Sequence, residues 1–452
     1  MTDSIRDLLN SVADRAATYS ETLDQRGVAP SAEALARLSE LDEALPDSPT
    51  APEDVLALLD DIGSPATVAT TGRRYFGFVT GGVLPAALAA NWMAGAWDQN
   101  SSSRIASPIT VKTEEVAMGW LLDVLKLPPT AAAAFVTGAT MANFTALAAA
   151  RHAVLAKVGW DVESDGLFGA PPIHVVVGEE AHSTLFRSLS LLGFGHQRVT
   201  KVPVDSQGRM RADALPKLSG PTIVCTQAGN VNSGAVDPIA EICQHAHAAN
   251  AWVHVDGAFG LWASASPARA YLTHGVDQAD SWATDAHKWL NVPYDSGLAF
   301  VRDPEALRAA LRLTAAYLPQ SDTREPSQFT PELSRRARSL EVWAALRSLG
   351  RSGLADLIER NCRFATRFAE GLRAAGYAIL NEVVLNQVVV SFGDADTTKR
   401  VMTGIQQEGT CWCGPTVWKG QSAMRISVSS WATTAADVEQ SLAAMLRVAG
   451  AA

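Results

Sequence analysis

The chain has 452 residues, of which 47% are hydrophobic and 19% are charged. This length and composition predict a globular protein with a large core and more than one domain. The formal net charge of −10 argues against nucleic-acid binding, which would need a basic patch. No basic stretch precedes an apolar run at the N-terminus and no apolar stretch is long enough to span a bilayer, so we expect neither a signal peptide nor a membrane segment.

Five cysteines in a chain of this length do not make a disulfide framework, and a reducing cytoplasm is the expected location. Cys411 and Cys413 form the one close pair. Because no further ligands follow nearby, two partly buried thiols are favoured over a metal or redox site, and we predict no metal site.

Residues 1–70 predict a helical segment. Apolar residues recur at helical spacing through 5–19 and 31–45, with Ser31 as a helix start, and residues 50–53 have the spacing of a capping box for another helix. We expect an N-terminal helical arm that packs on a partner subunit, and a plain surface cap is the alternative.

Between residues 71 and 315, helical stretches alternate with short runs rich in β-branched residues. The expected helices are 109–127, 142–158, 185–192 and 238–249, and the expected strands are 173–177, 222–226, 252–256 and 297–301. Near-continuous apolar strands between helices predict a large α/β domain with a mostly parallel sheet covered on both faces. Ligands of such sheets bind at the carboxyl ends of the strands.

From residue 316 to 452 the pattern changes, and it predicts a small C-terminal α+β domain. Helices are expected at 334–346, 354–374 and 435–448, and strands at 388–392 and 424–429.

Two charged residues indicate the chemistry. The apolar strand 252–256 ends in Asp256, and His287-Lys288-Trp289 follows among apolar neighbours. Enzymes that use pyridoxal 5′-phosphate (PLP) need a lysine amine that holds the cofactor aldehyde as a Schiff base, and a carboxylate that keeps the pyridine nitrogen protonated. The pair therefore predicts PLP and a reaction at the α-carbon of an amino acid. A structural carboxylate at a strand end is the alternative for Asp256.

Three loops after expected strands supply further candidates. Gly138, Ala139 and Thr140 precede an Ala-rich helix, where backbone amides and the helix N-terminus suit the cofactor phosphate; a bland helix cap is the alternative. His182 would reach the same sheet edge and stack on a flat cofactor, or it is an ordinary core or surface histidine. Asn230 would contact the cofactor or the substrate, or it bonds its own backbone in a turn.

The ordered motifs resemble those of the group II PLP-dependent decarboxylases, which act on aromatic amino acids, histidine and glutamate and have the PLP-dependent transferase fold type I. The motifs are 137–143, 181–183, 229–237, 254–258 and 287–289. The resemblance covers residues 70 to about 440. It implies a homodimer with the active site at the subunit interface.

The resemblance also implies roles for individual residues. Lys288 corresponds to the Schiff-base lysine, Asp256 to the partner of the ring nitrogen and His182 to the stacked imidazole. The remaining cofactor contacts that it implies are Gly138, Ala139, Thr140, Asn230, Ala258, Asp285 and His287. Asp285 falls where some members have an asparagine near the phosphate, and Asn230 falls where the aromatic decarboxylases have a threonine.

One departure from the family concerns the proton donor. Animal aromatic decarboxylases carry a loop tyrosine that helps to protonate the substrate carbanion, whereas residues 318–333 contain no tyrosine. Phe329 cannot donate a proton, and Tyr317 matches a different family position. Either another acid such as His182 protonates the carbanion, or the reaction does not end in simple protonation.

A second departure concerns the substrate wall. The family's large apolar residues are replaced by the polar stretch 100–104, which indicates a more polar pocket. Arg104 would pair with a substrate carboxylate, or it forms a salt bridge at the subunit interface. The candidate substrate contacts are Phe78, Ser102, Arg104 and Tyr317. In aminotransferases of this fold an arginine near Arg425 binds the α-carboxylate, but decarboxylase geometry favours a structural role for Arg425.

Together these observations predict PLP-dependent decarboxylation of an L-amino acid. Another PLP reaction at the α-carbon is the first alternative: a carbon–carbon lyase, an aminotransferase or an oxidative deaminating decarboxylase. A non-catalytic binding protein with this fold is disfavoured, because Lys288 and Asp256 are both present.

Overall fold

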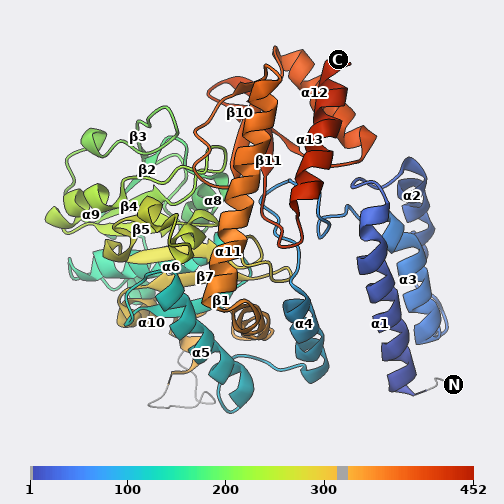
Figure 1. Ribbon diagram of the computed structural model, residues 1–452. Coiled ribbons are helices and arrows are strands. Elements are labelled where there is room, and N and C mark those ends of the chain that lie inside the picture. The colour runs from blue at the N-terminus through green and yellow to red at the C-terminus, as the bar shows by residue number, and fades with distance from the viewer. Residues whose placement is uncertain (1–3, 313–323, 452) are drawn as a thin grey trace.

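A seven-stranded sheet forms the centre of the computed structural model, which describes residues 4–312 and 324–451 (Figure 1). The strands lie in the order β1-β7-β6-β5-β4-β2-β3, and β7 alone runs antiparallel to its neighbours. Their bounds are β1 (Ala132–Val136), β2 (His174–Gly178), β3 (Thr200–Val202), β4 (Thr222–Gln227), β5 (Trp252–Asp256), β6 (Ser281–Asp285) and β7 (Gly297–Val301). The predicted mostly parallel α/β sheet is therefore confirmed.

Helices cover both faces of this sheet, so alternate residues of each strand enter two different apolar layers. One layer contains α5 (Pro108–Val124), α9 (Ile239–Ala248) and the first part of α11 (Ser339–Ala374). The other contains α6 (Ala139–Ala156), α8 (Ser183–Leu191) and α10 (Pro304–Leu311). A short helix, α7 (Val162–Asp165), follows α6. Burial on both sides leaves the strand ends as the accessible edge of the sheet.

The C-terminal part has its own antiparallel sheet, in the order β10-β11-β9-β8. Its elements are β8 (Ala378–Ile379), β9 (Gln387–Ser391), α12 (Ala395–Glu408), β10 (Gly414–Trp418), β11 (Gln421–Ser427) and α13 (Ala435–Gly450). The helices expected at 334–346 and 354–374 are joined in α11, which begins only at Ser339 and is interrupted at Gly350, where φ is 60°. The divisions at residues 70 and 315 stay a prediction.

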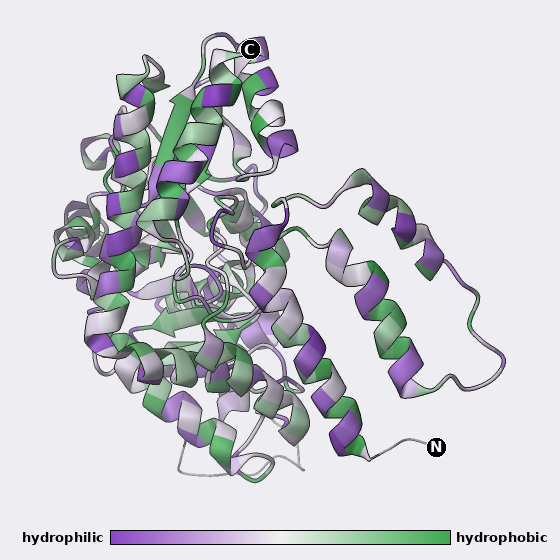
Figure 2. Ribbon diagram, turned by 45° about the vertical axis from the view of Figure 1, so that its right-hand side comes forward, coloured by the Kyte–Doolittle hydropathy of each residue, from purple (hydrophilic) through white to green (hydrophobic). Residues whose placement is uncertain are grey.

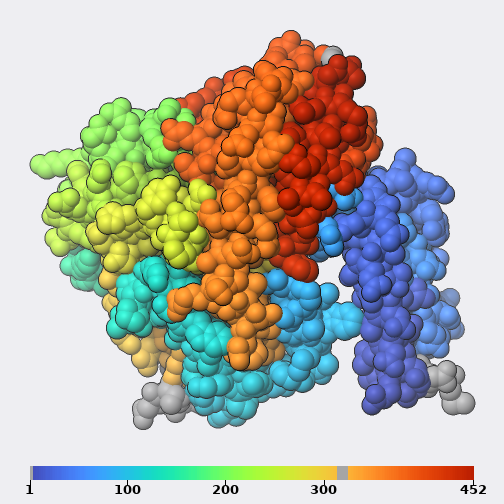
Figure 3. Space-filling view, in the orientation of Figure 1, coloured from blue at the N-terminus to red at the C-terminus, as the bar shows by residue number. Residues whose placement is uncertain are grey.

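The N-terminal helices α1 (Ile5–Thr22), α2 (Ala32–Ala36) and α3 (Pro52–Ala66) stand beside the body of the protein, next to α4 (Pro85–Trp97) (Figures 1 and 3). Ser31 caps α2 as predicted, because its hydroxyl accepts the Ala34 amide at 3.1 Å. The capping box at 50–53 is wrong: Ala51 is the N-cap of α3 and makes no side-chain cap bond. Pro52 begins this helix instead, since its fixed φ suits the first helical position. Within the described residues, no helix has the length and apolar character needed to cross a membrane.

Candidate active site

The carboxyl ends of β5 and β6 bring the two predicted acids and the lysine to one edge of the sheet. Asp256 ends β5 and Asp285 ends β6, and both are buried. The Lys288 amine lies 3.2 Å from Asp285 Oδ2. Asp285 Oδ1 accepts the Ala139 amide at 2.6 Å, so this acid links the lysine to the N-terminus of α6.

Close backbone packing holds the start of α6 against the lysine segment. A Cβ atom on Gly297 would lie 2.4 Å from Gly138 Cα, and one on Gly138 would lie 3.2 Å from His287 Cε1. Glycine is therefore required at 297, and a small residue at 138. The amides at the start of this 18-residue helix favour an anion. The predicted contacts Gly138, Ala139, Thr140 and His287 thus belong to a region suited to a phosphate.

Asp256 is held by two donors in a buried environment. Asn143 Nδ2 lies 3.3 Å from Asp256 Oδ2, and the Ala258 amide lies 3.3 Å from Oδ1. Burial raises the pKa of this carboxyl, while the nearby charges of His182 and Lys288 and the two hydrogen bonds oppose that rise. A buried carboxylate of this kind fits a cationic partner such as a protonated ring nitrogen.

His182 lies where the charged groups of the site meet. Its Nδ1 caps α8, at 2.8 Å from Thr184 Oγ1 and 3.3 Å from the Thr184 amide. Burial lowers the pKa of this histidine; Asp256 opposes that effect, whereas Lys288 and Arg425 add to it. His182 and Asp256 line one cavity, and the Lys288 amine lies 3.2 Å from Asp285 at the end of the neighbouring strand.

Arg425 is the one charged neighbour of His182 that was expected to be structural. It donates to the Val231 carbonyl at 2.9 Å, and burial lowers its pKa to about 10.

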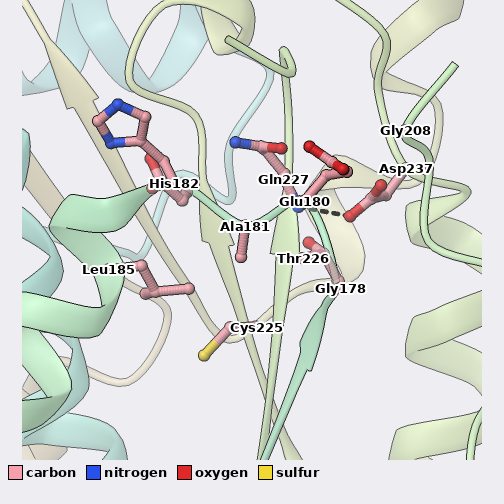
Figure 4. Close-up of a pocket in the computed structure, with 11 residues that line it drawn as sticks. Gly178, Glu180, Ala181, His182, Leu185, Gly208, Cys225, Thr226, Gln227 and Asp237 are labelled. Carbon is pink, nitrogen blue, oxygen red and sulfur yellow. Dashed lines mark hydrogen bonds between the residues drawn. The ribbon is translucent and has the colours of Figure 1, made fainter. Parts of the chain in front are cut away.

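A small cavity is lined by the last residues of β4 together with His182, Asp237 and Asp256 (Figure 4). Asp237 is buried there, and its two oxygens accept the Met210 and Gln227 amides at 2.7 Å each. Burial raises the pKa of Asp237 to about 7. In Figure 4 the His182 ring points away from this carboxylate.

Asn230 makes the hydrogen bonds of a turn residue. Its Oδ1 accepts the Asn232 and Ser233 amides at 2.9 and 3.1 Å, and it is buried. These bonds match the alternative given for it, and a contact with the cofactor stays a prediction.

The candidate substrate contacts lie in different surroundings. Phe78 is 61% exposed, with its ring 5.5 Å from Trp412. Ser102 is buried, and its carbonyl accepts the Ser327 amide at 2.9 Å. The Arg104 guanidinium pairs with Glu115 at 2.5 Å within the chain, so this ion pair needs neither a substrate nor a partner subunit. Tyr317 lies outside the described residues.

Three residues at the site were given no role from the sequence. Asn143 contacts Asp256, His254 contacts Asn143 at 2.9 Å, and the Tyr294 ring stacks on His287 at 4.3 Å. Asn143 lies one helical turn after Ala139, and His254 lies two residues before Asp256 on the same face of its strand. The sequence therefore carries a signal for both residues. No local pattern marks Tyr294. Among the described residues, no group of three or more His, Cys, Asp or Glu side chains is arranged to hold a metal ion.

Comparisons with known proteins find similar sequences over most of the chain. Residues 36–392 match the family described as pyridoxal-dependent decarboxylase conserved domain. An aromatic-L-amino-acid decarboxylase of Bacillus atrophaeus is 26% identical, with 91% of this chain and 87% of the relative covered. Tryptophan decarboxylase 1 of Oryza sativa subsp. japonica is 28% identical, with 95% and 90% covered.

Solved structures share the fold. The structure of Oryza sativa TDC with PLP and tryptamine superimposes with a TM-score of 0.90 at 22% identity, covering 100% of this chain and 98% of the other. Mouse CSAD also gives a TM-score of 0.90, at 20% identity and with 98% of each chain covered.

Proposed function

Since this chain belongs to the pyridoxal-dependent decarboxylase family, we propose that it removes the α-carboxylate of an L-amino acid at the site formed by Lys288, Asp256 and His182. The observation that supports these residues is their shared place: Asp256 ends β5, the Lys288 amine lies 3.2 Å from Asp285 at the end of β6, and His182 lines one cavity with Asp256. PLP is the cofactor of the family, and when bound it supplies an aldehyde for the amine and a ring that accepts electrons.

The surrounding residues fit this cofactor. The start of α6 would hold its phosphate, Lys288 would supply the amine for its aldehyde, and Asp256 would accept a hydrogen bond from the protonated ring nitrogen. His182 and Ala258 would contact the ring. Because Nδ1 of His182 is hydrogen-bonded to Thr184, Nε2 of His182 is the ring atom left to hold or move a proton at the substrate carbon. Burial lowers the pKa of His182, which favours the neutral ring at physiological pH.

The test is a screen of purified holoenzyme against the proteinogenic amino acids, with CO₂, amine and cofactor absorbance read together. Lys288→Ala should abolish both turnover and the absorbance of lysine-bound cofactor. Lys112→Ala, which changes an exposed lysine, is the matched control and should alter neither. Full turnover and unchanged absorbance in Lys288→Ala would exclude the proposed role.

A second candidate function is decarboxylation coupled to oxidative deamination, which gives an aldehyde and ammonia in place of the amine. The tyrosine-free stretch 318–333 supports it. A phenylacetaldehyde synthase of Petunia hybrida is 27% identical to this chain, with 73% of the chain and 68% of the relative covered. Measuring O₂ consumption and aldehyde alongside CO₂ separates the two reactions, because simple decarboxylation consumes no O₂.

We also propose that the protein is a homodimer assembled through its N-terminal arm. A groove of about 880 Å³ lies between α1, α3 and the body, lined in part by Leu59, Leu88 and Trp92. Figure 3 shows this hollow beside α4, and Figure 2 shows apolar residues along α1 and α3. Leu59 and Trp92 are 58% and 43% exposed in the single chain. An apolar surface of this kind fits a second copy.

Sedimentation of the wild type and of Leu59→Glu tests the dimer. The wild type should sediment as a dimer, and the variant should be monomeric at protein concentrations at which the wild type is still dimeric. Leu45→Glu changes a leucine that is 93% exposed outside the groove, and it should leave the assembly intact. A monomeric wild type would refute the proposal.

The proposed location is the cytoplasm. All five cysteines are buried and unpaired, as expected for a protein of a reducing compartment.

A further inference from the structure

A chain of four hydrogen bonds runs behind Asp256 through the interior of the protein. Trp252 Nε1 and His254 Nδ1 each lie 2.9 Å from Ser281 Oγ. His254 Nε2 lies 2.9 Å from Asn143 Oδ1, and Asn143 Nδ2 lies 3.3 Å from Asp256 Oδ2. The chain therefore connects an indole on β5, a hydroxyl on β6, an imidazole on β5 and an amide on α6 to the candidate carboxylate.

Sheet geometry explains why these groups meet. Side chains alternate along a strand, so Trp252, His254 and Asp256 share the face of β5 that α6 covers. Parallel pairing places Ser281 of β6 next to His254. All five side chains are at most 5% exposed. Water therefore does not compete for these hydrogen bonds, and each group must find its partner within the chain.

At each end of this hydrogen-bond chain, chemistry fixes which group donates and which accepts. The Trp252 indole can only donate, so Ser281 Oγ accepts from it. An ionised Asp256 can only accept, so the amide nitrogen of Asn143 points at it and the amide oxygen points at His254.

The middle of the chain follows from its ends. The Asn143 oxygen needs a donor, so the proton of neutral His254 is on Nε2. His254 Nδ1 is then an acceptor, and the Ser281 hydroxyl donates to it. Burial lowers the pKa of His254 to about 3, which keeps the ring neutral with one proton. Every group in the chain is satisfied in this one sense, from Trp252 to Asp256.

The opposite sense carries a cost at Asp256. It would turn the Asn143 oxygen toward the carboxylate, and two acceptors would face each other unless Asp256 were protonated. Because the Trp252 indole can only donate, the reversed arrangement would also make Ser281 Oγ accept from both Trp252 and His254, and it is compatible only with a protonated Asp256.

We infer that Trp252, Ser281, His254 and Asn143 form a relay of fixed hydrogen-bond sense that holds Asp256 ionised toward the ring nitrogen of the cofactor. The inference rests on the proposed role of Asp256, and it makes His254 and Asn143 positioning residues. Burial alone favours the protonated acid, so the relay opposes the environment in which Asp256 lies.

The first experiment reads the relay directly. Holoenzyme labelled with ¹⁵N-histidine contains nine imidazole rings, and the ring missing in His254→Gln is assigned to His254. The inference requires the tautomer with a protonated Nε2 and a bare Nδ1. A proton on Nδ1, or a doubly protonated ring, would overturn it.

The second experiment reads the result at the cofactor. Enzyme reconstituted with PLP that carries ¹⁵N in its ring should show a protonated ring nitrogen. Asn143→Leu removes the donor to Asp256, and the resonance should move toward that of a neutral pyridine. Thr145→Val on α6 and Thr284→Val on β6 are matched controls, because each removes a buried hydroxyl that has no hydrogen-bond partner in the described structure. They should leave the resonance in place.

Ser281→Ala gives an independent reading if Asn143→Leu fails to hold the cofactor. It removes the oxygen that joins Trp252 to His254, and the ring resonance should shift in the same direction by a smaller amount. An unchanged resonance in Ser281→Ala, or in a folded Asn143→Leu enzyme, would overturn the relay. Neither measurement uses a substrate, so failure of the relay is distinct from failure of the decarboxylase proposal, which CO₂ release and Lys288→Ala test.

Discussion

The Asp285 carboxylate lies 3.2 Å from the Lys288 amine, and it also accepts the Ala139 amide at the start of α6. A negative charge therefore occupies the place where this helix offers its amides to an anion. The lysine charge offsets it, so the pair is stable in the single chain. A phosphate at the same helix end would be repelled by the carboxylate.

Asp285→Asn should therefore bind PLP more tightly than the wild type. The side-chain oxygen of the asparagine can still accept a hydrogen bond from the Ala139 backbone N–H, but the negative charge that repels the phosphate is removed. We expect the dissociation constant to fall about tenfold, which corresponds to roughly 1.4 kcal/mol. Titration of apoprotein with PLP, followed by absorbance, measures it. Asp277→Asn removes the same charge at an exposed position and should have no effect. Weaker binding in Asp285→Asn would contradict this account.

His182 combines a helix cap with its place in the site, and two substitutions separate these roles. Asparagine is a good N-cap residue, so His182→Asn should keep the stability of the apoprotein, whereas His182→Phe should lose about 1 kcal/mol. Both should reduce CO₂ release by about a hundredfold, because neither offers an imidazole. Urea unfolding and turnover, measured on the same preparations, check the pair. High turnover in His182→Asn would assign the histidine to capping alone.

Local sequence patterns account for part of this architecture. The strand 252–256 and the cap at Ser31 follow from apolar content and hydrogen-bonding chemistry, and the structure has both. Strand β6 was not predicted, because Ser281–Asp285 mixes polar and small residues and is a strand only through its pairing with β5 and β7. The contact between Asn143 and Asp256 joins residues far apart in sequence, so it depends on how α6 packs on the sheet.

Gly81 is required by its approach to the lysine segment. A Cβ atom there would lie 1.8 Å from the Lys288 carbonyl oxygen. Because this oxygen belongs to the backbone, no side-chain rotation can relieve the clash. Gly81→Ala should lower the unfolding free energy of the apoprotein by about 3 kcal/mol and weaken PLP binding. Gly95→Ala adds the same methyl group inside α4 with nothing within 4 Å, and it should stabilise by about 0.5–1 kcal/mol. Equal effects of the two substitutions in urea unfolding would argue against steric displacement of Lys288.

The neutral, buried His254 should make the apoprotein sensitive to acid. Burial lowers the pKa of His254 from 6.5 to about 3. Below pH 6.5 the unfolded chain therefore binds a proton that the folded chain does not bind until about pH 3. The unfolding free energy should decrease as the pH falls through this window, with a contribution from His254 of up to about 1.4 kcal/mol per pH unit.

His254→Gln removes that contribution, so the quantity to compare is the change in unfolding free energy per pH unit in the variant and in the wild type. Burial also lowers the pKa of His182 and His287, and both are present in the variant. The glutamine side-chain amide can donate to Asn143 in place of Nε2, which keeps the hydrogen bond to Asp256, so these contributions cancel in the difference. Urea unfolding between pH 4 and pH 6 should thus show a smaller loss of stability per pH unit in His254→Gln than in the wild type, whatever its absolute stability. His174→Gln changes an exposed histidine and should keep the wild-type slope. Parallel slopes for His254→Gln and the wild type would mean that His254 takes up its proton equally in both states, which would be incompatible with a neutral imidazole fixed between Ser281 and Asn143.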